Sequence, residues 1–149
     1  MSEFAPSRFH GASGRNVVVC SDNRIRIVND GGEEIAEFDL KEDKIVASTA
    51  FGDFVVVSFS GDVSARGSEL GVLDIGEINA ETDTISEPPD HDGNKNDSIF
   101  KWERRLEGFI EAIGSMEGSF IFSLKGLGIY SMGISRNGRE IEINENWRL

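Results

Sequence analysis

The sequence predicts an all-β protein built from about three antiparallel four-stranded units, and two observations carry this prediction. Short runs rich in Val, Ile and Phe, which suit half-buried positions on a pleated sheet, alternate with Gly-containing turn segments. One stretch of the chain also occurs twice in recognisable form, and a weaker third copy precedes both. A repeat of fixed order indicates the fold more strongly than local propensity does. The chain is therefore expected to consist of similar β units placed one after another.

The clearest repeat relates residues 44–61 to residues 109–126 without a gap. Four aligned positions are identical, and the apolar positions of one segment fall on apolar positions of the other. A second match, between residues 70–76 and residues 127–133, follows the first in the same order. Two matches in one order indicate that a whole structural unit was duplicated.

A third and weaker copy opens the chain. Its apolar run, residues 17–19, corresponds to the runs 55–57 and 120–122, which are the expected buried centres of the units. Gly31-Gly32 in the first copy and Asn137-Gly138 in the last can supply the positive φ angles that tight hairpins need. Each unit thus contains a short apolar strand, a turn, a second strand of alternating polarity, a hairpin turn and a third strand.

In the second and third units a further strand comes first, at residues 45–50 and 110–115, so that each of these units has four strands. A four-stranded antiparallel unit of about 40 residues resembles one blade of a β-propeller, of the generic WD-repeat or quinoprotein-like kind. The resemblance covers about residues 17–143, which lack the Gly-His and Trp-Asp signatures. It implies an incomplete propeller of about three blades. The alternative is that the three meanders form a β-sandwich or a barrel.

The repeats divide one β domain, residues 16–149, into units at about 16–43, 44–107 and 108–149. Residues 1–15 are polar and contain Gly and Ser, which predicts a flexible N-terminal tail. This tail has no apolar segment that could act as a secretory signal, so we expect a cytoplasmic protein.

A polar insertion is expected at residues 77–98, where Pro88-Pro89 precedes a run of Asp, Asn and Gly. Residues 90–97 carry oxygen ligands at alternate positions, as calcium loops do. The EF-hand form does not fit, because Lys95 replaces the turn glycine and Lys101 replaces the bidentate Glu. A looser calcium loop and a solvated loop with turn-forming Asp and Asn both remain open.

The charge balance argues against two classes of partner. Fifteen Lys and Arg against 27 Asp and Glu give a formal net charge of −12, which opposes binding to nucleic acid and to anionic lipid. The longest apolar runs are far shorter than the ~20 residues that span a bilayer, so no membrane role is expected. Cys20 is the only cysteine, and its place after three valines predicts a small buried strand residue.

The residues offer little for catalysis. His10 and His91 are the only histidines, and both lie in segments expected to lack the rigid frame that a catalytic histidine needs. The Gly-rich segments 61–67 and 125–128 are not followed by Gly-Lys-Ser/Thr, so they are expected to be turns and not phosphate-binding loops. No catalytic, cofactor-binding or metal-binding residue is assigned, and no cofactor is expected.

The candidate partner-binding residues lie in two short segments that combine Trp and Arg, the residues most often found at binding hot spots. Residues 100–106 alternate apolar and charged side chains, as a half-exposed edge strand would. The candidates are Trp102, Arg104, Arg105, Trp147 and Arg148. The alternative is that both tryptophans are ordinary core or edge-covering residues.

Three blades cannot close a ring, and soluble proteins rarely leave sheet faces and strand edges bare. We therefore expect a non-enzymatic protein–protein interaction module, completed by a second copy or by another protein. The first unit, with one strand fewer, is expected to present an open edge that residues 140–149 of a neighbour could pair with. The alternative is a small-ligand-binding or hydrolytic propeller with its site at the central axis.

Overall fold

The computed structural model describes residues 6–40, 44–60, 67–77, 99–138 and 140–149, and most of these lie in β-strands. The predicted all-β class is confirmed. The elements are β1 (Pro6–Ala12), β2 (Arg15–Cys20), β3 (Arg24–Val28), β4 (Glu34–Asp39), β5 (Lys44–Phe51), β6 (Phe54–Ser60), β7 (Glu69–Asp74), the short 3-10 helix η1 (Ile75–Glu77), β8 (Trp102–Arg105), β9 (Ile110–Met116), β10 (Ser119–Leu124), β11 (Gly128–Asn137) and β12 (Glu140–Arg148).

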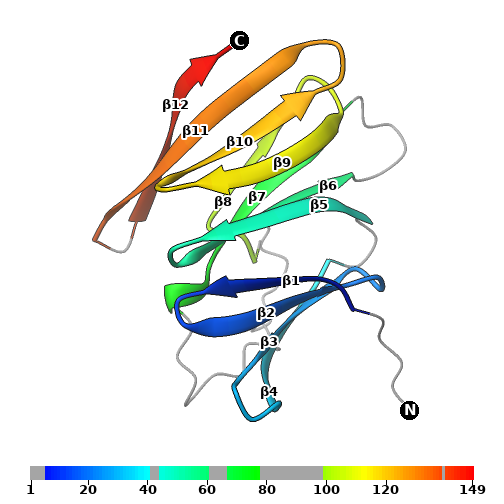
Figure 1. Ribbon diagram of the computed structural model, residues 1–149, viewed down its shortest axis with the longest axis vertical. Coiled ribbons are helices and arrows are strands. Elements are labelled where there is room, and N and C mark those ends of the chain that lie inside the picture. The colour runs from blue at the N-terminus through cyan, green and yellow to red at the C-terminus, as the bar shows by residue number, and fades with distance from the viewer. Residues whose placement is uncertain (1–5, 41–43, 61–66, 78–98, 139) are drawn as a thin grey trace, which may run out of the picture.

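The strands form three antiparallel sheets of four, each paired in chain order. Sheet 1 is β1-β2-β3-β4, sheet 2 is β5-β6-β7-β8 and sheet 3 is β9-β10-β11-β12. The three sheets are stacked, with sheet 2 in the middle (Figure 1). They approach one another at their first strands, because β5 contacts both β1 and β9.

The N-terminal segment differs from its prediction. Residues 1–15 were expected to be a flexible tail, but Pro6–Ala12 forms β1 and pairs with β2 from Pro6↔Cys20 to Ala12↔Arg15. Ser13 (φ 55°) and Gly14 (φ 72°) make the tight turn between these strands. Sheet 1 therefore has four strands, and its first unit does not lack an early strand as the sequence suggested.

The C-terminal segment also differs from its prediction. Residues 140–149 were expected to be available for pairing with a neighbouring chain, but Glu140–Arg148 forms β12 and pairs with β11 of the same chain. Gly138, with φ 73°, lies in the predicted turn between β11 and β12. Because this hairpin closes locally, one side of the backbone ladder of β12 is already satisfied within sheet 3.

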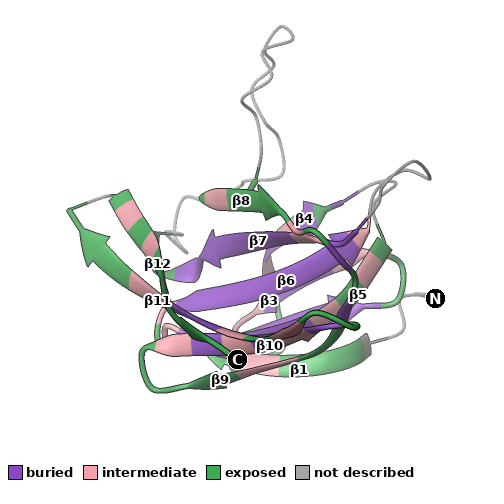
Figure 2. Ribbon diagram, turned by 90° about the horizontal axis from the view of Figure 1, so that it is seen from above, coloured by how far each residue is buried: buried purple, intermediate pink, exposed green. Residues whose placement is uncertain are grey.

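The central strands of sheet 2, β6 and β7, are buried on both faces, as their colouring in Figure 2 shows. Successive side chains of a strand point to opposite faces, so β6 contributes to two separate cores. Val55 and Val57 pack in the cluster shared with sheet 1, whereas Phe54 and Val56 pack in the cluster shared with sheet 3.

The polar insertion predicted at 77–98 lies outside the described residues except at Glu77. Its two flanks are joined by an ion pair of 2.8 Å between Lys101 Nζ and Glu77 Oε2. Lys101 N also donates to Val72 O at 2.7 Å, which sets the start of β8 against β7. No helix among the described residues is both long and apolar enough to cross a membrane.

Candidate functional site

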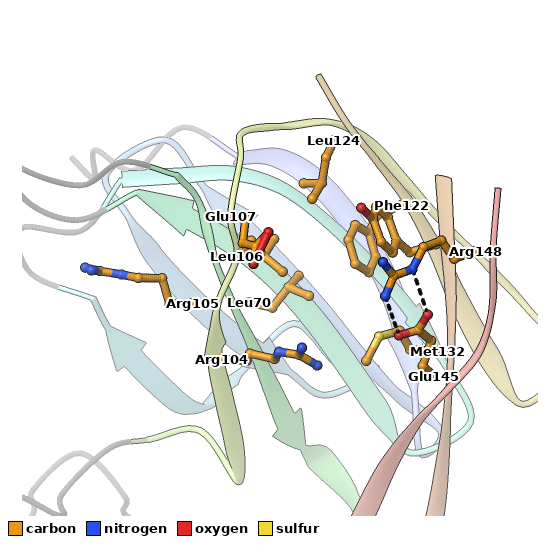
Figure 3. A pocket seen from close by; sticks show the side chains of 11 residues that line it. Leu70, Arg104, Arg105, Leu106, Glu107, Phe122, Leu124, Met132, Glu145 and Arg148 are labelled. Carbon is orange, nitrogen blue, oxygen red and sulfur yellow. Dashed lines mark hydrogen bonds and ion pairs between the residues drawn. The ribbon is translucent and has the colours of Figure 1, made fainter. Parts of the chain in front are cut away.

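A pocket of about 140 Å³ lies between sheets 2 and 3, beside their last strands β8 and β12 (Figure 3). It lies away from the first strands, where the three sheets approach one another. Its lining comes from β7, β8 and the residues just after β8 on one side, and from β10, β11 and β12 on the other. These residues are Leu70, Arg104, Arg105, Leu106, Glu107, Phe122, Leu124, Tyr130, Met132, Glu145 and Arg148.

The inner part of the pocket is apolar. Leu70 of β7 and Phe122, Leu124 and Met132 of sheet 3 are all buried and belong to the core cluster between the two sheets. Phe122 and Leu124 lie two residues apart on β10, so strand alternation places both side chains on the face of sheet 3 that looks toward sheet 2. The Phe122 ring stacks on Tyr130, with centroids 5.3 Å apart and ring planes 11° apart. The pocket therefore offers an aliphatic side and an aromatic side.

One side of the rim is held by an ion pair. Arg148 Nε lies 3.1 Å from Glu145 Oε2, and Arg148 Nη2 lies 3.3 Å from Glu145 Oε1. The Arg148 guanidinium also lies over the Tyr130 ring, 5.2 Å from its centroid. The hydrogen bonds from Arg148 lower the pKa of Glu145, and the same bonds raise the pKa of Arg148. Both groups are thus charged at neutral pH.

The other side of the rim is Arg104 of β8. Arg104 pairs with Leu70 in the sheet, so both side chains face sheet 3, and Figure 3 shows the guanidinium pointing toward Glu145 and Met132. Arg104 forms no hydrogen bond and no close ion pair with the described residues, but its charge helps to lower the pKa of Glu145. Its neighbour Arg105 points the opposite way, and its guanidinium lies 3.7 Å from Glu69.

The structure brings three of the five predicted partner-binding residues to one pocket, namely Arg104, Arg105 and Arg148. Trp102 is half-buried and packs against the core between sheets 2 and 3. Trp147 pairs with Ser131 and therefore lies on the opposite face of sheet 3. β8 is the last strand of its sheet, as expected of an edge strand.

Sequence analysis missed the residues that complete the pocket. Tyr130, Met132 and Glu145 carry no motif, and they meet Arg104 only because sheets 2 and 3 stack. The spacing of Tyr130 and Met132 along β11 shows that they share one face of the strand. It does not show which sheet packs against that face.

The outer face of sheet 3, which points away from sheet 2, is a second candidate surface. Cross-strand pairing places Gly114, Ile121, Ser131 and Trp147 in one row across its centre. The two adjoining rows are equally free of charge and consist of Ala112, Ser123 and Ile129, and of Met116, Ser119, Gly133 and Asn144. Trp147, Ile129 and Met116 are 44%, 40% and 55% exposed.

The outer face of sheet 1 is of the opposite kind. Arg26 is only 8% exposed and forms ion pairs with Asp22, Glu34 and Glu37 at 3.3–3.5 Å. Its Nη1 also donates to Cys20 Sγ at 3.0 Å. Cys20 is buried as predicted, and burial is the main reason that its pKa is raised. A thiol with a raised pKa in a buried position is a packing residue and not a nucleophile.

The surroundings of His10 do not resemble a catalytic site. His10 is on β1 and not in an unstructured tail, and its Nε2 lies 2.8 Å from Ser48 Oγ of β5. No third group orients the imidazole among the described residues, and Ser48 is buried, so this bond joins sheets 1 and 2. His91 and the calcium-like segment 90–97 lie outside the described residues, as do residues 61–66. Among the residues described, no group of three His, Cys, Asp or Glu side chains could hold a metal ion.

No protein-family model matches the chain, and no curated protein matches its sequence.

Proposed function

We propose that this protein is a non-enzymatic protein–protein interaction module that assembles through the outer face of sheet 3. The observation that carries the proposal is the absence of charge from the three central rows of that face, in a chain of which 28% is charged. Interface centres are depleted of charged residues and enriched in Trp and Met. Trp147 and Met116, both exposed, fit that composition.

The stacking of the sheets supports a partial propeller. Each sheet runs in chain order from a first strand, near the neighbouring sheets, to a last strand farther out. Sheets 1 and 2, and sheets 2 and 3, pack face to face through apolar side chains. A further sheet from another protein, or from a second copy, could continue this packing on sheet 3. Gly114, which has open space where a Cβ atom would lie, would let it approach closely.

Sedimentation velocity at micromolar concentrations tests this proposal. We expect self-association that increases with concentration and that Ile121→Asp abolishes, because the substitution places a charge in the central row. A matched control is Phe9→Asp, which changes an exposed apolar residue on sheet 1. A chain that stays monomeric, with no difference between these variants, contradicts self-assembly through sheet 3.

A heterologous partner gives a different result. In that case the chain is monomeric alone, and cross-linking in extracts through a reactive group introduced at Ser123 captures a defined protein. Ile121→Asp then removes that product, whereas Phe9→Asp leaves it in place. If neither association nor a product sensitive to Ile121→Asp is found, the proposed function is wrong.

A further inference from the structure

We infer that the pocket between sheets 2 and 3 binds one large apolar side chain of a partner peptide, with an adjacent carboxylate of that peptide held by Arg104. The pocket lies on the face of sheet 3 that packs against sheet 2, whereas the proposed assembly surface is the opposite, outer face of sheet 3. The two sites are therefore independent, and one can fail without the other.

The size of the pocket excludes most other ligands. Its volume of about 140 Å³ is below the ~300–1,000 Å³ of typical small-molecule and cofactor sites. It is close to the ~150 Å³ of an engineered apolar cavity that accepts one benzene molecule. The occupant is therefore a single ring or branched aliphatic group. In a protein partner such a group is the side chain of Phe or Leu.

The chemistry of the inner part favours an apolar occupant. Leu70, Leu124 and Met132 contribute aliphatic or thioether surface, and the stacked Phe122 and Tyr130 rings contribute an aromatic wall. Burying one such side chain gives only very weak binding by itself. The rest of the affinity has to come from groups outside the pocket, which argues for a peptide and against a free small molecule.

The charges at the rim select the peptide. Arg105 points away from the pocket toward Glu69, so the rim combines two arginines, Arg104 and Arg148, with two glutamates, Glu107 and Glu145. Arg148 is hydrogen-bonded to Glu145, whereas Arg104 acts on Glu145 only through its charge and donates to no carboxylate among the described residues. One further carboxylate on Arg104 completes the arrangement. Charge-assisted bonds to Arg are about twice as strong as neutral ones.

The position of the pocket suits an extended chain. β8 and β12, which flank it, are the last strands of their sheets, so within the described part of the chain each has one side without a strand partner. An extended segment can lie along such an edge and place alternate side chains on one face. This geometry allows the apolar residue to enter while a neighbouring carboxylate reaches Arg104.

Fluorescence anisotropy with short labelled peptides tests the inference. The probe is a seven-residue peptide of Gly and Ser with a central Asp-Phe-Asp, and the matched peptides carry Asp-Ala-Asp or Lys-Phe-Lys instead. We expect saturable, salt-sensitive binding of the first peptide and at least tenfold weaker binding of the other two. Arg104→Gln should weaken the first peptide about tenfold, whereas Arg24→Gln, the same change on the outer face of sheet 1, should not.

A second measurement keeps the test independent of folding. Methyl NMR signals of Leu70 and Met132 should shift on addition of the Asp-Phe-Asp peptide, and Ile121→Asp should leave both the shifts and the affinity unchanged. No binding, or equal binding of all three peptides, overturns the inference. Phenylacetate that binds as tightly as the peptide also overturns it, because the pocket would then be a small-molecule site. Loss of peptide binding in Ile121→Asp would show that the two surfaces are one.

Discussion

Sheet 2 and sheet 3 contain the two clearest copies of the repeat, yet they occupy different environments. β6 of sheet 2 is buried along both faces, whereas β10 of sheet 3 alternates between buried and half-buried residues. Val56 and Ile121 are equivalent in the repeat, but Val56 is 0% exposed and Ile121 lies on the outer face. The difference shows that burial follows from the place of a sheet in the stack and not from the repeated pattern alone.

The two outer faces of the stack, on sheet 1 and on sheet 3, also differ from each other. The outer face of sheet 1 is occupied by the ion pairs of Arg26, whereas the central rows of the outer face of sheet 3 have no charge. Covering the first face with protein would remove several charges from water, which costs free energy that their pairing only partly returns. Charged side chains on an end sheet also discourage unwanted pairing. The two ends of the stack are therefore not equivalent as binding surfaces.

The largest expected effect comes from placing a carboxylate at equivalent positions of the two copies. Val56→Asp puts a charge between sheets 2 and 3 without a partner and should cost several kcal/mol, enough to unfold a typical domain. Ile121→Asp should cost about 1 kcal/mol, because its side chain reaches water. Urea unfolding followed by circular dichroism measures both. Equal losses would mean that the outer face of sheet 3 is covered within the chain.

The next effect concerns the ion pair that joins sheets 2 and 3. Arg136 Nη1 and Nη2 lie 2.8 and 2.9 Å from the Asp74 carboxylate, whose side chain is 2% exposed, and these bonds raise the pKa of Arg136. Arg136→Met leaves a buried carboxylate unpaired and should cost about 2–4 kcal/mol. Arg148→Met, which removes an exposed pair, should have a much smaller effect. Similar thermal shifts for both variants would contradict this ranking.

A smaller effect of opposite sign is expected at the equivalent serines of the repeat. Ser58 Oγ is buried between sheets 2 and 3 and has no hydrogen-bond partner among the residues that the structure describes. Ser58→Ala should therefore stabilise the protein by about 1 kcal/mol, because the unsatisfied hydroxyl is removed. Ser123→Ala, on the half-exposed outer face, should be close to neutral. A loss of stability in Ser58→Ala, measured by chemical unfolding, would mean that the hydroxyl has a partner.

The smallest expected effect is a pH dependence at the junction of sheets 1 and 2. Burial first, and the charge of Arg8 second, lower the pKa of His10 below its ordinary value of about 6.5. The unfolded chain then binds a proton at His10 more readily than the folded chain does. The stabilising contribution of neutral His10 is therefore complete above pH ~6.5 and is lost as the pH falls through the pKa of His10 in the folded protein. We expect the loss of stability between pH 7 and pH 5.5 to be less than about 1 kcal/mol, because His10 is only half-buried.

His10→Gln is the control for this pH dependence, since glutamine can still bond to Ser48 but does not titrate. The unmodified chain should lose stability relative to His10→Gln as the pH is lowered over that interval. Parallel pH profiles would exclude His10 as the source.

Much of the strand pattern was predictable because strand formation is largely local. The apolar runs, the turn at Gly138 and the edge strand Trp102–Arg105 followed from alternation and turn residues. β1 was missed because Phe9 is its one large apolar residue, and His10 and Arg8 gave it a polar appearance. Its pairing with β2 depends on a valine-rich neighbour that is already a strand. The role of residues 140–149 was missed because pairing within the chain and pairing with a neighbour use the same residues.

The all-β class, the repeated units and most strand positions follow from the amino-acid sequence alone, because a period of two residues and the turn-forming glycines are local properties. Which face of each strand is buried depends on the packing of the sheets. That choice depends on the order in which the sheets stack, and sheet stacking involves residues far apart in the chain. It buried Val56, left the equivalent Ile121 on an outer face, and brought Arg104 opposite Arg148 and Glu145 to form the pocket.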